Sequence, residues 1–102
     1  MLDPSIYTNY VNIHLSIDKF DGINYETWTS DFKLWLKSQG YVHHLTHPNV
    51  AENEVSRWLK IDAQLCILIK FTICSSLKQF FRTYEIFSKV WEQAKLLCTN
   101  DT

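Results

Sequence analysis

The sequence predicts an all-α fold, a small bundle of about four helices with an extended N-terminal arm. Of the 102 residues, 46% are hydrophobic and 15% are aromatic, which gives a single domain enough apolar side-chain area to form a core. Only 2 glycines and 2 prolines are present, too few for the turns of a many-stranded sandwich or barrel. From Tyr25 onward, apolar residues recur every three or four positions, the period of a helix with one buried face.

The N-terminal region shows two patterns. Residues 1–10 are mostly polar and have no period, so they are expected to form a loose arm. Between Val11 and Phe20 apolar and polar residues alternate, which predicts extended backbone with one face turned inward. Asp21 and Gly22 then mark a turn. Because one strand cannot form a sheet, this segment is expected either to lie across the helices or to offer an edge to a partner.

The first helix is predicted from Tyr25 to Gln39. Asn24 is expected to cap its N-terminus, and Gly40 to stop it. Its apolar stripe is Trp28, Phe32, Trp35 and Leu36. A short apolar turn over residues 41–45 follows, and Pro48 ends it.

Two further helices follow in the second half. One should begin near residues 51–54, where acidic side chains favour a helix N-terminus. Its apolar positions are Val55, Trp58, Ile61, Leu65, Leu68, Ile69 and Ile73. Its later part is apolar on nearly every side, which indicates a central helix or one that carries a partner. After a separate turn over residues 77–81, Thr83 is expected to cap the last helix. The apolar stripe of that helix is Phe87, Val90, Trp91, Ala94, Leu97 and Cys98.

The sequence contains few candidates for catalytic or metal-binding residues. His43, His44 and His47 lack a complete zinc ligand set, so we interpret them as surface or loop histidines. The three cysteines lie in or beside apolar runs, where burial disfavours the thiolate, and core packing explains them better. Asp62 is either a buried partner of a neighbouring basic residue (Arg57 or Lys60) or simply on the solvent side of its helix, and we favour the second. With two glycines, a phosphate-binding loop is excluded. We therefore predict no enzyme, no catalytic residue, no metal, no cofactor and no small-molecule substrate.

Charge and hydropathy limit the partners. The net charge is -1, and residues 51–102 carry seven basic and six acidic side chains, so no direct nucleic-acid binding is expected from this segment. The longest apolar run, residues 65–74, is far shorter than the roughly 20 residues of a membrane span. The acidic start does not resemble a signal peptide. These features predict a protein of the cytoplasm or the nucleus without a membrane partner.

The pattern becomes specific in the run from Phe20 to Tyr25 (Phe-Asp-Gly-Ile-Asn-Tyr) with Trp28 following. It resembles the N-terminal Gag region of copia-type LTR retrotransposons, and the plant elements are the best fit. The resemblance continues through His44-Leu45, residues 58–65, residues 75–79 and residues 90–92, in the order of that family. Each piece is short, and their order and spacing together make the resemblance specific. The matching or core residues are Phe20, Gly22, Asn24, Tyr25, Trp28, Phe32, Trp35, Leu45, Trp58, Asp62, Leu65, Val90 and Trp91.

The resemblance implies a non-enzymatic structural domain that self-associates in a capsid-like particle. Residues 11–102 would be the N-terminal helical domain of a longer Gag, whose RNA-binding zinc knuckle follows further along. We expect the contacts between copies on the outward residues of the helices over 55–74 and 84–98, with apolar surface such as Ile67 and Phe71 left exposed. Phe71 and Cys98 depart from the family pattern. The alternative is therefore a decayed or co-opted Gag copy that serves as a protein–protein interaction module in its host.

Overall fold

The computed structural model describes residues 17–46 and 48–99, and the fold is all-α as predicted. Within these residues there are three α-helices: α2 (Tyr25–Gln39), α3 (Val55–Phe71) and α4 (Phe87–Thr99). Three short 3-10 helices lie between them: η1 (Val42–Leu45), η2 (Glu52–Glu54) and η3 (Ser75–Phe80). The predicted loose arm over 1–10, residues 11–16 of the alternating segment, and His47 lie outside the described residues.

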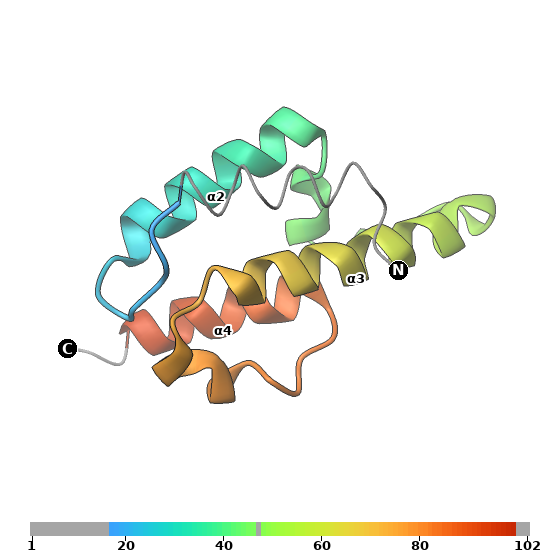
Figure 1. Ribbon diagram of the computed structural model, residues 1–102. Coiled ribbons are helices and arrows are strands. Elements are labelled where there is room, and N and C mark those ends of the chain that lie inside the picture. The colour runs from blue at the N-terminus through green and yellow to red at the C-terminus, as the bar shows by residue number, and fades with distance from the viewer. Residues whose placement is uncertain (1–16, 47, 100–102) are drawn as a thin grey trace.

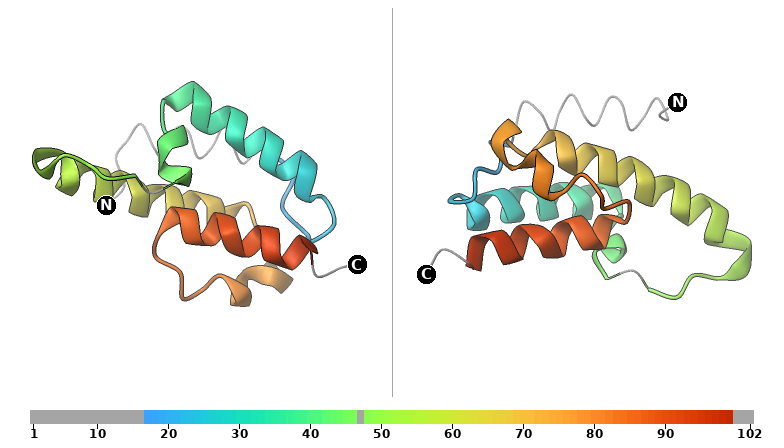
Figure 2. Two further views of the ribbon diagram at one scale, coloured as in Figure 1. Left: turned by 180° about the vertical axis from the view of Figure 1, so that it is seen from behind. Right: turned by 90° about the horizontal axis from the view of Figure 1, so that it is seen from below.

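The three α-helices pack side by side, with α2 antiparallel to α3 and α4 parallel to α3 (Figures 1 and 2). The start of α4 meets the middle of α3, where Phe87 N–H donates to Asp62. Parallel neighbours need a connection that returns along the bundle, and residues 72–86, which include η3, make it (Figure 1). The turn predicted near residues 77–81 is thus part of this crossover.

The predicted bounds are confirmed for α2, whereas α3 begins at Val55, just after the predicted start region 51–54, and ends at Phe71, before Ile73. α2 spans the predicted residues, and Gly40 ends it in the left-handed conformation at φ 77°. The prediction for the last helix was wrong at its start, since α4 begins at Phe87 and Thr83 lies well before it. The reason is that the carboxylate of Asp62, on α3, accepts the Phe87 N–H at 3.0 Å and supplies the cap from another helix.

The turn before α2 is held by side chains, but not as predicted. Asn24 sits at the N-cap position without capping α2; its side chain accepts the Asp21 N–H and donates to the Lys19 carbonyl. Asp21 accepts the N–H groups of Ile23 and Asn24 at 2.8 and 3.0 Å. Gly22 adopts φ 92°, a region that side chains other than glycine rarely enter. The turn is therefore an Asp–Gly–Asn unit in which the two polar side chains stabilise each other's backbone.

The extended residues before this turn lie on the end of α3. Phe20 N–H donates to the Thr72 carbonyl at 2.7 Å, and Cys74 N–H donates to the Phe20 carbonyl at 3.0 Å. These bonds form an isolated parallel bridge between Phe20 and Ile73. Of the two expectations for this segment, its described end fits the one in which it lies across the helices.

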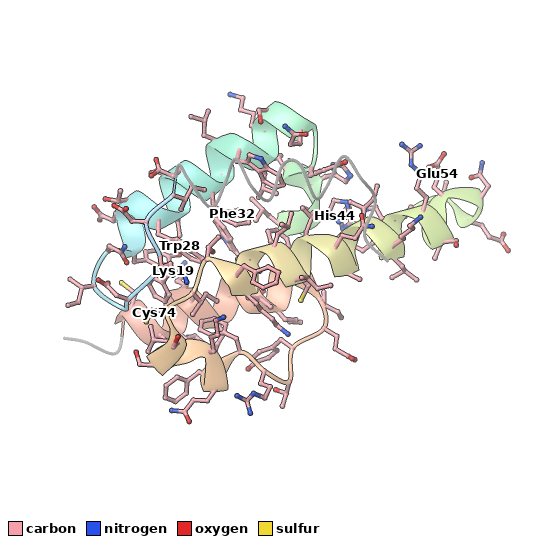
Figure 3. All side chains as sticks on the ribbon, in the orientation of Figure 1. Lys19, Trp28, Phe32, His44, Glu54 and Cys74 are labelled. Carbon is pink, nitrogen blue, oxygen red and sulfur yellow. The ribbon has the colours of Figure 1, made fainter. Side chains whose placement is uncertain are left out.

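The core lies between α2, α3 and α4 and is rich in aromatic side chains. Trp28 stacks on Phe20 with ring centroids 4.8 Å apart and on Trp91 at 5.8 Å. Its indole N–H donates to the Thr72 hydroxyl at 2.9 Å, which satisfies its buried polar atom. Figure 3 shows Trp28 and Phe32 pointing from α2 towards the other helices. The fully buried large side chains are Trp28, Phe20, Phe32, Phe81, Phe87, Leu36, Leu65, Leu68, Ile69 and Ile73.

Candidate functional site

Most of the residues singled out in the sequence are structural. Phe20, Phe32, Leu65 and Val90 are fully buried, and Trp28 is buried beside them. Tyr25, Trp35, Leu45 and Trp91 are half-buried and pack against this core. Gly22 and Asn24 shape the turn described above. The structure thus brings these residues together as one packing unit, in which the Trp28 indole bonds to the Thr72 hydroxyl and the Asn24 side chain bonds to the backbone.

Asp62 and His44 form a second, polar cluster that the sequence interpretation missed. His44 was taken for a surface or loop residue and Asp62 for the solvent side of α3, and both interpretations were wrong. The side chains of His44 and Asp62 are 1% and 4% exposed, and His44 Nδ1 lies 3.0 Å from Asp62 Oδ1. The His44 ring stacks on Trp58 with centroids 4.3 Å apart. The Asp62 carboxylate can be buried because each of its oxygens has a hydrogen-bond partner. His44 is the partner of Oδ1, and the Phe87 N–H is the partner of Oδ2.

This cluster connects three elements of the fold. Asp62 links η1, through His44, to the first residue of α4, so three elements meet at one carboxylate. In the described part of the chain, the hydrogen bonds of His44 reach Asp62 and no hydroxyl or thiol that could act as a nucleophile. The arrangement is a polar anchor between helices.

A cavity of about 490 Å³ opens next to this anchor, between η1, the loop at 48–50 and the first half of α3. Its lining residues include Tyr41, His43, His44, Arg57 and Trp58, a mixture of aromatic and polar side chains. Burial, with a smaller contribution from neighbouring His44, lowers the pKa of His43. The volume falls in the range of about 300–1,000 Å³ typical of ligand pockets. This cavity can therefore hold a side chain or a short segment of a partner.

The cysteines and histidines do not assemble a metal centre in the part of the chain that the structure describes. No three His, Cys, Asp or Glu side chains are grouped there so as to hold an ion. All three cysteines are free thiols; Cys66 is buried, whereas Cys74 and Cys98 are partly buried. Burial raises the pKa of Cys66, which keeps the thiol protonated and unreactive. Cys66 is thus a core residue, as predicted.

The outer side of α3 carries a row of exposed apolar side chains at four-residue spacing. We call this row, made of Val55, Leu59, Ala63, Ile67 and Phe71, the α3 row. Leu59 is 53% exposed and Ile67 43% exposed. Exposure of Ile67 and Phe71 was expected from the sequence. Residues four apart on a helix form the ridges with which helices commonly pack against each other.

Comparisons with protein families, with curated proteins and with solved structures find no match for this chain. In the residues that the structure describes, no helix is both long and apolar enough to cross a membrane.

Proposed function

We propose that this chain is a non-enzymatic structural domain of a copia-like LTR retrotransposon Gag polyprotein that self-associates in a capsid-like particle. The sequence resemblance, with its order of short motifs, supports the Gag assignment. The roles of its residues agree with a structural domain, since Phe20, Gly22, Asn24 and Trp28 build a turn and a core. The proposal includes the rest of the resemblance: a plant element, a longer Gag with its zinc knuckle further along, and a cytoplasmic or nuclear location.

The observation that carries self-association is the α3 row. Rows of residues four apart on two helices interdigitate when the helices cross at about -50°. A two-fold axis through such a crossing brings the row of one copy against the same row of a second copy. Leu59 and Ile67, the most exposed large residues of the row, would lose apolar surface to water in that contact. A single contact of this size is weak, and many copies in a particle supply stability through multivalency.

Light scattering on a size-exclusion column, run over a range of protein concentrations, tests this proposal. We expect oligomers that grow with concentration, and particles in electron micrographs at the highest concentration. Ile67→Glu, combined with Leu59→Glu, places charges in the row and should give a monomer. Leu34→Glu is the matched control, because Leu34 is 67% exposed on α2, outside the row. A strict monomer for the native chain, or equal loss of assembly in the Leu34 control, would contradict the proposal.

The second candidate is a decayed or co-opted Gag copy that binds a host protein as a monomer. The cavity of about 490 Å³ beside His44 favours it, because peptides commonly bind in grooves between helices. Selection of a displayed peptide library on the native chain tests this candidate. Binding should fall in Arg57→Glu, at the cavity, and persist in Lys60→Glu, an exposed residue outside the cavity lining. Selected peptides that bind both variants equally, or no selected peptide, would exclude it.

A further inference from the structure

A small cavity at the C-terminal end of α3 is lined mainly by cations. Its volume is about 180 Å³, and its lining residues are Lys70, Ile73, Lys78, Phe81 and Arg82. The three basic residues come from three successive segments: the end of α3, η3 and the turn that follows it. Ile73 and Phe81 are 0% and 1% exposed and form an apolar wall. We call this site the basic cavity. Its positive charges therefore lie beside low-dielectric protein, where electrostatic interactions are stronger than in water.

These charges form no ion pair among the residues that the structure describes. The two ion pairs found there are His44–Asp62 and Lys89–Glu92, and neither includes a residue of the basic cavity. Glu85, the acidic residue nearest in sequence to Arg82, is exposed and forms no ion pair with it. Three like charges around one cavity repel each other, so an anion bound between them would be stabilised.

The ammonium group of Lys70 is held by one hydrogen bond and keeps donors with which it can bind an anion. Its ammonium group donates to the Tyr84 carbonyl at 2.6 Å, which holds the crossover loop against α3. An ammonium group has three donors, so two remain for another acceptor. Lys78 is placed beside the Phe71 ring, with its Nζ 5.8 Å from the ring centroid. At least one of the three cations is thus partly ordered before any anion arrives, which lowers the entropic cost of binding.

We propose that the basic cavity binds a phosphate group. Arginine offers a planar fork of donors that matches phosphate oxygens, and lysine binds phosphate as a point charge. The cavity is smaller than the roughly 300 Å³ at which pockets for whole drug-sized ligands begin, so it fits a phosphate group rather than an entire nucleotide. The phosphate can belong to a free polyphosphate or to an RNA backbone. The basic cavity adjoins the Phe71 end of the α3 row, since Lys78 Nζ lies 5.8 Å from the centroid of the Phe71 ring, but none of the residues that line the cavity belongs to the row.

Calorimetric titration of the full 102-residue chain with pyrophosphate tests the site. The variant pair Lys78→Gln with Arg82→Gln removes two of the three charges and leaves the Lys70–Tyr84 bond intact. Lys33→Gln with Lys95→Gln is the matched control, because it removes the same charge from exposed positions on α2 and α4. Loss of two charge-assisted contacts should weaken binding by about tenfold or more in the first pair and leave the control unchanged. Circular dichroism of each variant checks that the helices are intact.

A second titration, with a single-stranded RNA oligomer, identifies the source of the phosphate. If RNA binds, and if Lys78→Gln with Arg82→Gln weakens its binding, the slope of log K against log salt should fall by about 0.7 per lost contact. If only pyrophosphate binds, the ligand is a free polyphosphate. The proposal is overturned if pyrophosphate does not bind, or if the control pair weakens binding as much as the Lys78/Arg82 pair.

Discussion

The two ends of α3 are held in place by different physical means. The C-terminal end lies among apolar side chains, with Leu68, Ile69 and Ile73 fully buried and Phe20 bonded alongside. Towards the N-terminal end, residues 51–57 are exposed. There Trp58 stacks on His44 of η1, and the carboxylate of Asp62 ties the helix to both η1 and α4. Apolar packing is a sum of many small contacts, whereas a buried charged group depends on every one of its partners. We therefore expect the stability of the C-terminal end to fall in proportion to the apolar contacts removed. The N-terminal end is expected to lose its attachment when a single group is removed.

The largest effect is expected from Trp28→Ala at the apolar end. Removing a buried tryptophan should lower the free energy of unfolding by about 3–5 kcal/mol, measured by urea denaturation followed by circular dichroism. Trp28→Phe keeps an aromatic ring and loses the bond to Thr72, so it should cost about 1 kcal/mol. Equal losses in the two variants would show that the hydrogen bond, and not packing, holds this end.

Asp62→Ala tests the polar end, with an expected loss of about 3 kcal/mol because it leaves buried His44 and the Phe87 N–H without their acceptor. Lys60→Ala is the control, an exposed residue of the same helix, and should change stability by less than about 0.5 kcal/mol. Hydrogen exchange should show faster exchange at η1 and the start of α4 in Asp62→Ala. Uniform acceleration that includes the Phe20 and Cys74 amides would mean that the two ends are not independent.

A smaller effect is expected from Gly22→Ala. A Cβ at this position would meet only Leu77 Cδ1 at 3.7 Å, an ordinary contact, so the cost comes from the backbone angle of φ 92°. Strain of this kind costs on the order of 1–3 kcal/mol. Gly40→Asn is the comparison, because Gly40 lies in the left-handed helical region with open space around it, and asparagine tolerates that region. Thermal unfolding should show a clear drop in Tm for Gly22→Ala and little change for Gly40→Asn.

The smallest expected effect is on how the stability of the protein depends on pH in the acidic range. The amides of Ile23 and Asn24 donate to Asp21 and lower its pKa below the ordinary value of 3.8. Its contribution to stability is therefore complete above that value and is lost as the pH falls through the lower, folded pKa. Asp21→Asn should flatten this part of the stability profile, measured by urea denaturation between about pH 5 and pH 2. A profile that Asp21→Asn leaves unchanged would contradict the assignment to Asp21.

Elements specified by neighbouring residues could be predicted from the sequence. The bounds of α2 followed from its apolar stripe and from Gly40, and burial of Trp28, Phe32 and Val90 followed from their period. Exposure of Ile67 and Phe71 was expected from the resemblance to a longer Gag, and both side chains are exposed. These features depend on contacts within one helical turn or on one face.

Features that depend on distant partners could not be predicted. The start of α4 is capped by Asp62, 25 residues earlier, and His44 is buried against the same carboxylate from 18 residues away. A polar residue in an apolar helix has the same pattern whether its partner is protein or water. The one available signal for His44 was its position in an apolar turn, between Val42 and Leu45. The basic cavity draws on the end of α3, a 3-10 helix and a turn, whose combined geometry has no period.

The bridge between Phe20 and Ile73 affects how the chain folds while it is being synthesised. It joins residues 53 positions apart, and Trp28 also needs Trp91, from the last helix, to complete its stacking. Contacts between distant positions form slowly, because the chain must close a long loop before it gains any stabilisation. During synthesis Phe20 therefore lacks its backbone partners until residues 72–74 have emerged, and the aromatic core stays open until α4 follows. Chains that stop before residue 87 should remain substrates for proteases, so that only complete copies of this domain accumulate.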